Sequence, residues 1–95
     1  MKIYLTAIIK AKNEYRDEVA AVLQDMVIQT QKEEACELYS LHRGIDDENL
    51  FTFYEIWKNK EGLDAHNEQP YIKAFGQLVE EKLQEAPTIL LTTLI

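Results

Sequence analysis

Four stretches of the chain show the alternation of apolar and polar residues that is typical of β-strands. In residues 2–11 the apolar side chains occupy every second position, as in a strand with one buried face. Residues 50–58 are rich in aromatic and β-branched types. A short polar turn at 44–49 joins the strand at 50–58 to another strand at 35–43. The shortness of this connection predicts that the two strands form an antiparallel hairpin. The stretch 88–95 predicts a fourth strand.

Helical spacing of apolar residues fills the segments between these strands. Asn13, a residue type favoured at helix N-caps, precedes acidic residues, and the helical pattern after it runs to about Lys32. Asn59 caps a short second helix, and Pro70 suits the first position of a third. Pro87 ends the helical region. The third helix carries apolar residues at core spacing, namely Tyr71, Ile72, Phe75, Leu78, Val79 and Leu83.

These elements follow the order β-α-β-β-α-β, with the second helical segment broken in two. This order is typical of the ferredoxin-like fold, an α+β architecture in which helices cover one face of an antiparallel sheet. The chain has 95 residues and contains no linker, repeat or low-complexity stretch. We therefore expect a single domain spanning residues 1–95.

Both faces of the predicted sheet carry apolar residues. In a two-layer α+β domain, the sheet face without helices is expected to be polar. The strand at 50–58 and the strand at 88–95 are instead apolar on both sides, and the chain has no further element to cover the second face. We therefore predict a homodimer in which two sheets pack face to face.

Charge and glycine content exclude several classes of ligand. The formal net charge is −7, from 17 acidic and 10 basic residues. This balance argues against nucleic acid and against an anionic membrane surface, since both require clustered Lys and Arg. Only three glycines are present, and none forms a phosphate-binding loop. A bound dinucleotide or nucleoside triphosphate is therefore not expected.

The cysteine content and the N-terminal pattern indicate a cytoplasmic protein. Cys36 is the single cysteine, so an internal disulfide is impossible, which fits a reducing compartment. The N-terminal apolar run is interrupted by Lys10, Lys12 and Glu14, too early for a signal peptide or a spanning helix.

Glu55 is the most unusual residue of the strand at 50–58, because it shares a face with Phe53 and Trp57. A carboxylate on an aromatic face loses hydration unless it is paired. One interpretation is an edge or interface glutamate that binds Arg, Lys or a backbone N–H of a partner chain. The other is a functional carboxyl with a raised pKa, or one that orients a histidine.

His66 is the second candidate for chemistry. It lies three residues after Leu63, so both side chains point the same way on the short helix, towards the sheet. A functional histidine here would be a general base or a hydrogen-bonding group at the mouth of a pocket between sheet and helix. The alternative is a half-buried structural histidine bonded to a nearby backbone group.

The remaining candidates are weaker. His42 lies near a strand end, and the acid next to Cys36 raises the pKa of the thiol and so disfavours a nucleophile. The acidic residues at 46–48 lack the spacing of a calcium loop, and no metal site is expected. Aromatic residues could line a pocket for a flat apolar molecule or simply form core; they are Tyr54, Trp57, Tyr71 and Phe75.

The stretch LFTFYEIWKNKEGLDAHNEQPYIKAF (Leu50 to Phe75) is similar to the antibiotic biosynthesis monooxygenase family of small dimeric α+β barrels. The family pattern is an aromatic-rich strand ending in Glu-x-Trp, a helix with Leu and His, and then an aromatic or His before a Phe. The resemblance extends over essentially the whole chain. The matching positions here are Glu55, Trp57, Leu63, His66, Tyr71 and Phe75.

The resemblance implies a cofactor-independent monooxygenase acting on a quinol or polyphenolic substrate. In such members the deprotonated substrate itself reduces dioxygen in a dry aromatic pocket, without flavin or metal. His66 would then accept the proton or orient the phenol, and Glu55 would support it or the dimer. The pocket walls would be Phe53, Trp57, Tyr71 and Phe75.

Other activities of similar proteins give the alternatives. Haem-degrading relatives use Asn, Trp and His where this chain has Ala7, His66 and Gly76, so haem degradation is not expected. A non-catalytic dimeric protein that binds a small molecule or acts in a stress response is the main alternative. An isomerase of a small metabolite is another, and it would require a more polar pocket.

Overall fold

The computed structural model describes all 95 residues, Met1 to Ile95. Four strands, one short 3₁₀ helix and three α-helices follow the predicted order, and the second helical segment is split as expected. Their bounds are β1 Ile3–Lys10, η1 Asn13–Tyr15, α1 Arg16–Thr30, β2 Cys36–Arg43, β3 Leu50–Trp57, α2 Lys60–Asn67, α3 Pro70–Lys82 and β4 Thr88–Thr92.

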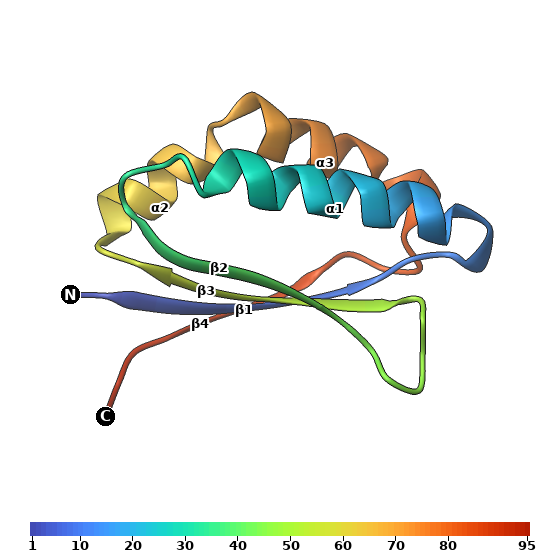
Figure 1. Cartoon of the computed structure of the whole chain (residues 1–95), viewed down its shortest axis with the longest axis horizontal. Helices are drawn as coiled ribbons and strands as arrows, with labels where there is room; N and C mark the ends of the chain where they lie inside the picture. The colour runs from blue at the N-terminus through green and yellow to red at the C-terminus, as the bar shows by residue number, and fades with distance from the viewer.

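The strands form one antiparallel sheet in the order β2-β3-β1-β4. All three helices lie on the same side of this sheet (Figure 1). The central strands β1 and β3 are those with the strongest apolar alternation, because both are buried under the helices. The predicted ferredoxin-like α+β fold is therefore confirmed.

The strand register aligns the residues that face the helices into rows across the sheet. Tyr39 pairs with Glu55, Glu55 with Leu5, and Leu5 with Leu91. The next row consists of Leu41, Phe53, Ala7 and Ile89. These two rows lie on the sheet face that the helices cover.

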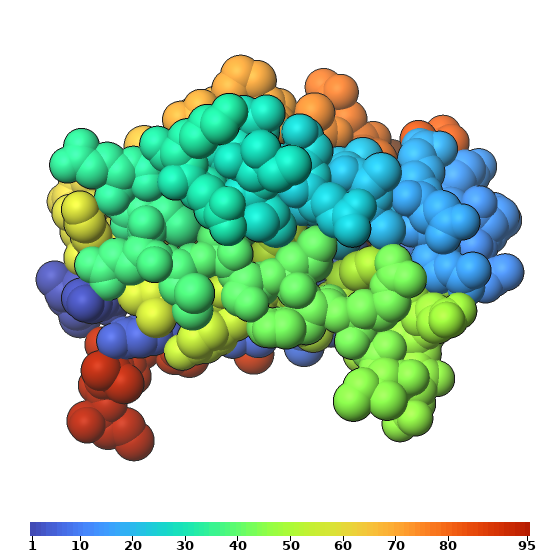
Figure 2. Space-filling model, in the orientation of Figure 1, coloured from blue at the N-terminus to red at the C-terminus, as the bar shows by residue number.

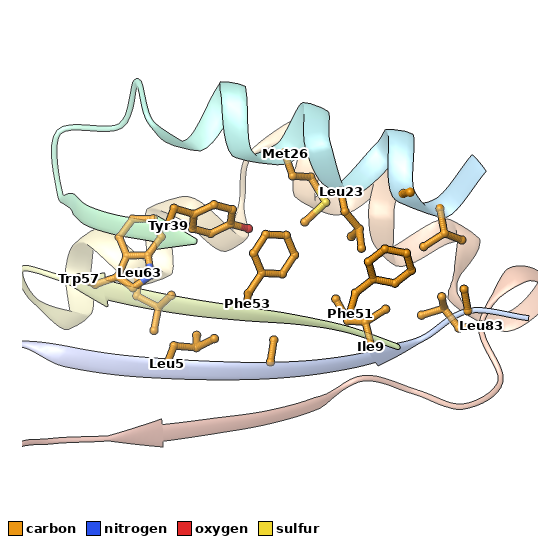
Figure 3. Packing of buried hydrophobic residues seen from close by; sticks show 14 of the residues in the cluster. Leu5, Ile9, Leu23, Met26, Tyr39, Phe51, Phe53, Trp57, Leu63 and Leu83 are labelled. Atoms are coloured by element: carbon orange, nitrogen blue, oxygen red, sulfur yellow. The ribbon is translucent and has the colours of Figure 1, made fainter. Parts of the chain in front are cut away.

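The hydrophobic core lies between α1 and the middle of the sheet (Figure 3). Phe51, Phe53 and Trp57 of β3 are its largest fully buried side chains, and Leu23 packs against them from α1. Burying a large apolar side chain stabilises the fold by roughly 1.5–3 kcal/mol. The predicted inward face of β3 is therefore confirmed, and it includes Glu55.

The start of α1 differs from the prediction. Asn13 does not cap the helix; it opens a 3₁₀ turn closed by a hydrogen bond from Tyr15 N to Lys12 O (3.0 Å). The α-helix begins only at Arg16 and ends at Thr30, two residues before the predicted end. The side chain of Asn13 instead accepts a hydrogen bond from the side-chain amide of Asn49 (3.4 Å).

The end of α3 also differs, since Pro87 is not the residue that stops it. The helix ends at Lys82, and Leu83 is extended and buried, paired with Ala11 in an isolated bridge. Backbone hydrogen bonds to the segment after β1 outcompete another helical turn. They run from Lys12 N to Lys82 O (2.9 Å) and from Gln84 N to Lys10 O (2.8 Å).

The sheet face opposite the helices is bare within one chain. The β2–β3 turn and the C-terminal residues both project beyond this face (Figures 1 and 2). Strand β4 ends at Thr92, opposite Tyr4, so the predicted strand at 88–95 is shorter by three residues. None of the helices has the length and apolar character needed to cross a membrane.

Candidate active site

A cavity of about 230 Å³ lies between the sheet and helices α2 and α3. Its floor comes from helix-facing residues of all four strands, and the helices contribute its other walls. Eleven of its fifteen lining residues are hydrophobic. The lining consists of Leu5, Ala7, Ile9, Met26, Tyr39, Phe53, Glu55, Leu63, His66, Asn67, Ile72, Phe75, Pro87, Ile89 and Leu91.

The cavity exists because α3 packs loosely over the β1–β4 edge of the sheet. No residue of α3 is fully buried, and Ile72 and Phe75 line the cavity at partial burial. Ala7 leaves space in the floor where a larger side chain would fill it. Ile89 and Leu91 line the cavity and are 52% and 58% exposed, so the cavity reaches the surface along β4.

Helix α2 carries His66 to the cavity. Asn59 caps this helix as predicted, its side-chain oxygen accepting a hydrogen bond from Gly62 N (2.8 Å). Leu63 and His66 both point into the interior, as their spacing predicted, and each is only 4% exposed. His66 Nδ1 lies 2.8 Å from Glu33 Oε2, and this is the hydrogen bond that the imidazole makes within the chain.

Burial sets the charge of His66. Desolvation lowers the pKa of the imidazole below its usual value, and the hydrogen bond to Glu33 opposes this only in part. The ring is therefore neutral at neutral pH, with one nitrogen that carries a proton and one that accepts.

Glu33 is a site residue that the sequence analysis missed. It lies in the connection between α1 and β2, and its side chain is 13% exposed. One oxygen, Oε2, accepts hydrogen bonds from both His66 Nδ1 and the hydroxyl of Tyr71. In the sequence, Glu33 and Glu34 form a polar loop with no local signal that separates one acid from the other.

Glu55 also lines the cavity, so it does not belong to the bare outer face of the sheet. It is 4% exposed, and its Oε1 accepts a hydrogen bond from Trp57 Nε1 (2.8 Å). Burial, with a smaller contribution from the nearby Glu33, raises the pKa of this carboxyl to about 7, although the hydrogen bond from Trp57 opposes the shift. Near neutral pH the group therefore populates both the acid and the carboxylate.

The predicted wall residues divide into two pairs. Phe53 and Phe75 line the cavity, whereas Trp57 and Tyr71 do not. Trp57 is fully buried, with its ring centroid 4.5 Å from that of His66, and Tyr71 is bonded to Glu33. Trp57 therefore contacts Glu55 and His66, and Tyr71 contacts Glu33, without lining the cavity.

Tyr39 lines the cavity, and the sequence analysis did not single it out. It is 5% exposed, and its ring centroid lies 5.5 Å from that of His66. Figure 3 shows its hydroxyl directed into the layer between α1 and the sheet. Burial raises the pKa of Tyr39, so the hydroxyl keeps its proton. Tyr54, by contrast, lies on the outer face of β3 and is 40% exposed.

The weaker candidates lie away from the cavity. His42 is exposed and within 3.0 Å of Ser40 Oγ. Burial raises the pKa of the Cys36 thiol to about 11, so a reactive thiolate does not form at neutral pH. No group of three or more His, Cys, Asp or Glu side chains is arranged to hold a metal ion.

Residues 2–78 match the family model described as antibiotic biosynthesis monooxygenase. The chain belongs to this family. A Bacillus subtilis protein named "Putative monooxygenase YcnE" is 32% identical over 92 residues, covering 97% of each chain. An uncharacterized Synechocystis protein, sll1783, is 33% identical over 67 residues, or 70% of this chain and 46% of that protein. Membership and the Bacillus relative support a monooxygenase-like role.

Solved structures show the same fold. PA3566 from Pseudomonas aeruginosa aligns with a TM-score of 0.92 at 24% identity, over 99% of this chain and 94% of that chain. Rv0793 from Mycobacterium tuberculosis aligns with a TM-score of 0.93 at 20% identity, over 100% and 96%. At these identities the likeness concerns the fold alone.

Proposed function

We propose that this protein is a cofactor-independent monooxygenase that oxidises a quinol-like or polyphenolic small molecule with O₂. The observation that carries the proposal is the position of His66 and Glu55 in the wall of one apolar cavity. The apolar lining limits the contact of water with a reactive anion, and the two polar groups supply a proton acceptor and a proton donor.

His66 is the proposed proton acceptor. Its Nδ1 is engaged by Glu33, so Nε2 is the nitrogen left for a substrate hydroxyl in the cavity. The lowered pKa of the ring keeps it neutral, which a base requires. Deprotonation of the substrate raises its electron density and allows it to reduce O₂. One oxygen atom enters the product and the other leaves as water.

Glu55 is the proposed proton donor for the reduced oxygen. With a pKa near 7, its acid form is present at neutral pH and can be restored after each cycle. Trp57 fixes one carboxyl oxygen and also packs against the ring of His66, so it couples the orientation of the two groups.

The size and lining of the cavity favour a flat aromatic substrate. A cavity of about 150 Å³ lined by aliphatic and aromatic residues accommodates one benzene ring. The cavity here is about 230 Å³, so it has room for a molecule of one or two rings. Phe53 and Phe75 offer ring faces, and the polar groups near α2 can orient a hydroxyl.

Oxygen uptake with a panel of hydroquinones and polyphenols tests the proposal. We expect uptake with the wild-type protein and a loss of roughly 10²- to 10⁴-fold in kcat/KM for His66→Ala, the usual contribution of a general base. His42→Ala is the matched control, because His42 is exposed and outside the cavity. It should leave the rate unchanged.

Two results would contradict this function. Equal rates of oxygen uptake in wild type and His66→Ala would show that His66 is not the proton acceptor. Tight binding of these phenols without any uptake would instead indicate a non-catalytic binding protein.

We also propose that two copies associate through their bare sheet faces. The outer face of the sheet carries both apolar and hydroxyl side chains. The β2–β3 turn and the C-terminus project beyond this same face (Figures 1 and 2). Leu38, Tyr54 and Leu90 on this face are 40%, 40% and 49% exposed. A second copy would bury these surfaces symmetrically.

A further inference from the structure

We propose that Glu33 is a positioning residue that holds His66 in the tautomer with its proton on Nδ1, leaving Nε2 to accept a proton in the cavity. The catalytic use of that acceptor rests on the proposed function. The tautomer itself is a property of the folded chain and can be measured without any substrate.

The backbone around Glu33 is fixed on both sides. Glu33 N donates to Thr30 O at the end of α1 (2.9 Å), and Cys36 N at the start of β2 donates to Glu33 O (3.1 Å). The side chain therefore leaves a short, hydrogen-bonded turn rather than a free loop. It reaches His66 on α2, 33 residues further along the chain.

The contact between Glu33 and His66 determines which ring nitrogen carries the proton. A carboxylate only accepts hydrogen bonds, so Nδ1 at 2.8 Å from Oε2 must be the donor. A neutral imidazole has a single N–H group, so its other nitrogen, Nε2, holds a lone pair. The side chain of His66 is 5% exposed, and water does not compete freely for Nδ1.

Tyr71 fixes the carboxylate in turn. Its hydroxyl donates to the same oxygen, Oε2, that accepts from His66. Tyr71 is in the first turn of α3, so Glu33 joins the α1–β2 connection, α2 and α3 at one atom. This restricts rotation of the carboxylate and fixes the plane of the imidazole.

The carboxylate also stabilises the state after proton transfer. When a phenol O–H breaks and a new N–H forms on Nε2, the ring becomes an imidazolium beside the negative charge of Glu33. The substrate carries the balancing negative charge. The rings of Tyr39 on β2 and Tyr71 on α3 lie 5.5 and 6.4 Å from the imidazole, and Glu55 on β3 lines the same cavity.

Nuclear magnetic resonance of protein labelled with ¹⁵N-histidine tests the assignment. Long-range ¹H–¹⁵N correlations distinguish the two neutral tautomers, and the chain has only two histidines, so exposed His42 is an internal reference. For wild type at pH 7.5 we expect His66 to be neutral with its proton on Nδ1. An Nε2–H tautomer in the wild-type protein would overturn the proposal without any variant.

Glu33→Gln and its neighbour Glu34→Gln form a matched pair. Glu34 is exposed, in the same turn, and one residue away. In Glu33→Gln we expect a mixed tautomer and a lower His66 pKa, because an amide can accept or donate and carries no charge. Glu34→Gln should match wild type. If Glu33→Gln also matches wild type, Glu33 does not position the ring.

Tyr71→Phe and steady-state kinetics separate this role from a structural one. Tyr71→Phe removes a contact to Glu33 but keeps the carboxylate, so His66 should retain its Nδ1 proton even if stability falls.

In oxygen uptake, Glu33→Gln should lower kcat roughly tenfold or more with little change in KM, because Glu33 touches no substrate. If the tautomers are as expected but wild type shows no oxygen uptake, only the proposed function is rejected. If wild type consumes oxygen but Glu33→Gln keeps the wild-type tautomer, only the role of Glu33 is rejected.

Discussion

At the residue scale, the site consists of ionisable groups whose charge depends on burial. Glu55 has one polar partner, Trp57 Nε1, and is otherwise enclosed by the cavity wall and the core. His66 has one partner, Glu33. Burial therefore favours the neutral form of each group. At the same pH in water, a glutamate side chain would be mostly charged and a histidine side chain partly charged.

Glu55→Gln should change the pH dependence of stability. The folded-state pKa is about 7 against an ordinary 4.5, so between these values the folded chain retains a proton that the unfolded chain has lost. The contribution of Glu55 to the free energy of unfolding therefore falls as pH rises from about 4.5 to 7, by about 3 kcal/mol at most. Glutamine keeps the acceptor for Trp57 and lacks this slope.

Urea denaturation of both proteins from pH 5 to pH 8 measures the effect. The difference between them isolates Glu55, because the other titrating groups are common to both. We expect the variant to gain stability relative to wild type as pH rises. Parallel curves across this range would mean that the carboxyl is ionised throughout.

The sequence reveals His66 and Glu55 but not Glu33, for a physical reason. Glu55 stands out because the alternation of side chains along a strand places it on the same face as Phe53 and Trp57. His66 stands out because it shares a helix face with a core leucine. Glu33 acquires its role only from contacts with residues 33 and 38 positions away. Nothing local in a polar turn encodes such a contact.

At the scale of elements, alternation predicted the strands well and local capping rules predicted helix ends unevenly. Asn59 and Pro70 begin their helices as expected, because their effects depend on the backbone next to them. The ends of α3 and β4 depend on which distant backbone groups are available. Leu83 leaves the helix to pair with Ala11, and β4 stops opposite Tyr4 near the start of β1.

Helix α2 is held against the start of β2 by a close approach at Gly62. A Cβ placed on Gly62 would lie 2.3 Å from the Cβ of Ala35, so one of the two elements would have to move. We expect Gly62→Ala to destabilise the protein by about 1–3 kcal/mol, the usual cost of overpacking. Because His66 follows one turn later on α2, oxygen uptake should fall as well.

Gly76→Ala is the matched control for this prediction. Gly76 is also in a helix, α3, but a Cβ there would meet no atom within 4 Å. Alanine should therefore stabilise the chain by about 0.5–1 kcal/mol through helix propensity. Thermal denaturation of the two variants should give shifts of opposite sign. A Gly62→Ala variant as stable as wild type, or more stable, would show that Gly62 is not a packing constraint.

At the scale of the whole molecule, one layer of helices covers only half of the surface that the sheet offers. The outer rows run across all four strands, and the middle one consists of Ser40, Tyr54, Thr6 and Leu90. In a symmetric pair of sheets this middle row would lie near the two-fold axis. A charge introduced there would be buried against the same charge of the second copy.

Tyr54→Asp should therefore convert a dimer into a monomer. Size-exclusion chromatography with light scattering at micromolar concentration should give the wild-type protein about twice the chain mass of 11.1 kDa, and the variant 11.1 kDa. Desolvation and like-charge repulsion oppose association, while the half-exposed position of Tyr54 leaves the core intact. Gln77→Asp, on the exposed side of α3, carries the same charge and should remain dimeric. A monomeric wild type would exclude this interface, and a dimeric Tyr54→Asp would place it on another surface.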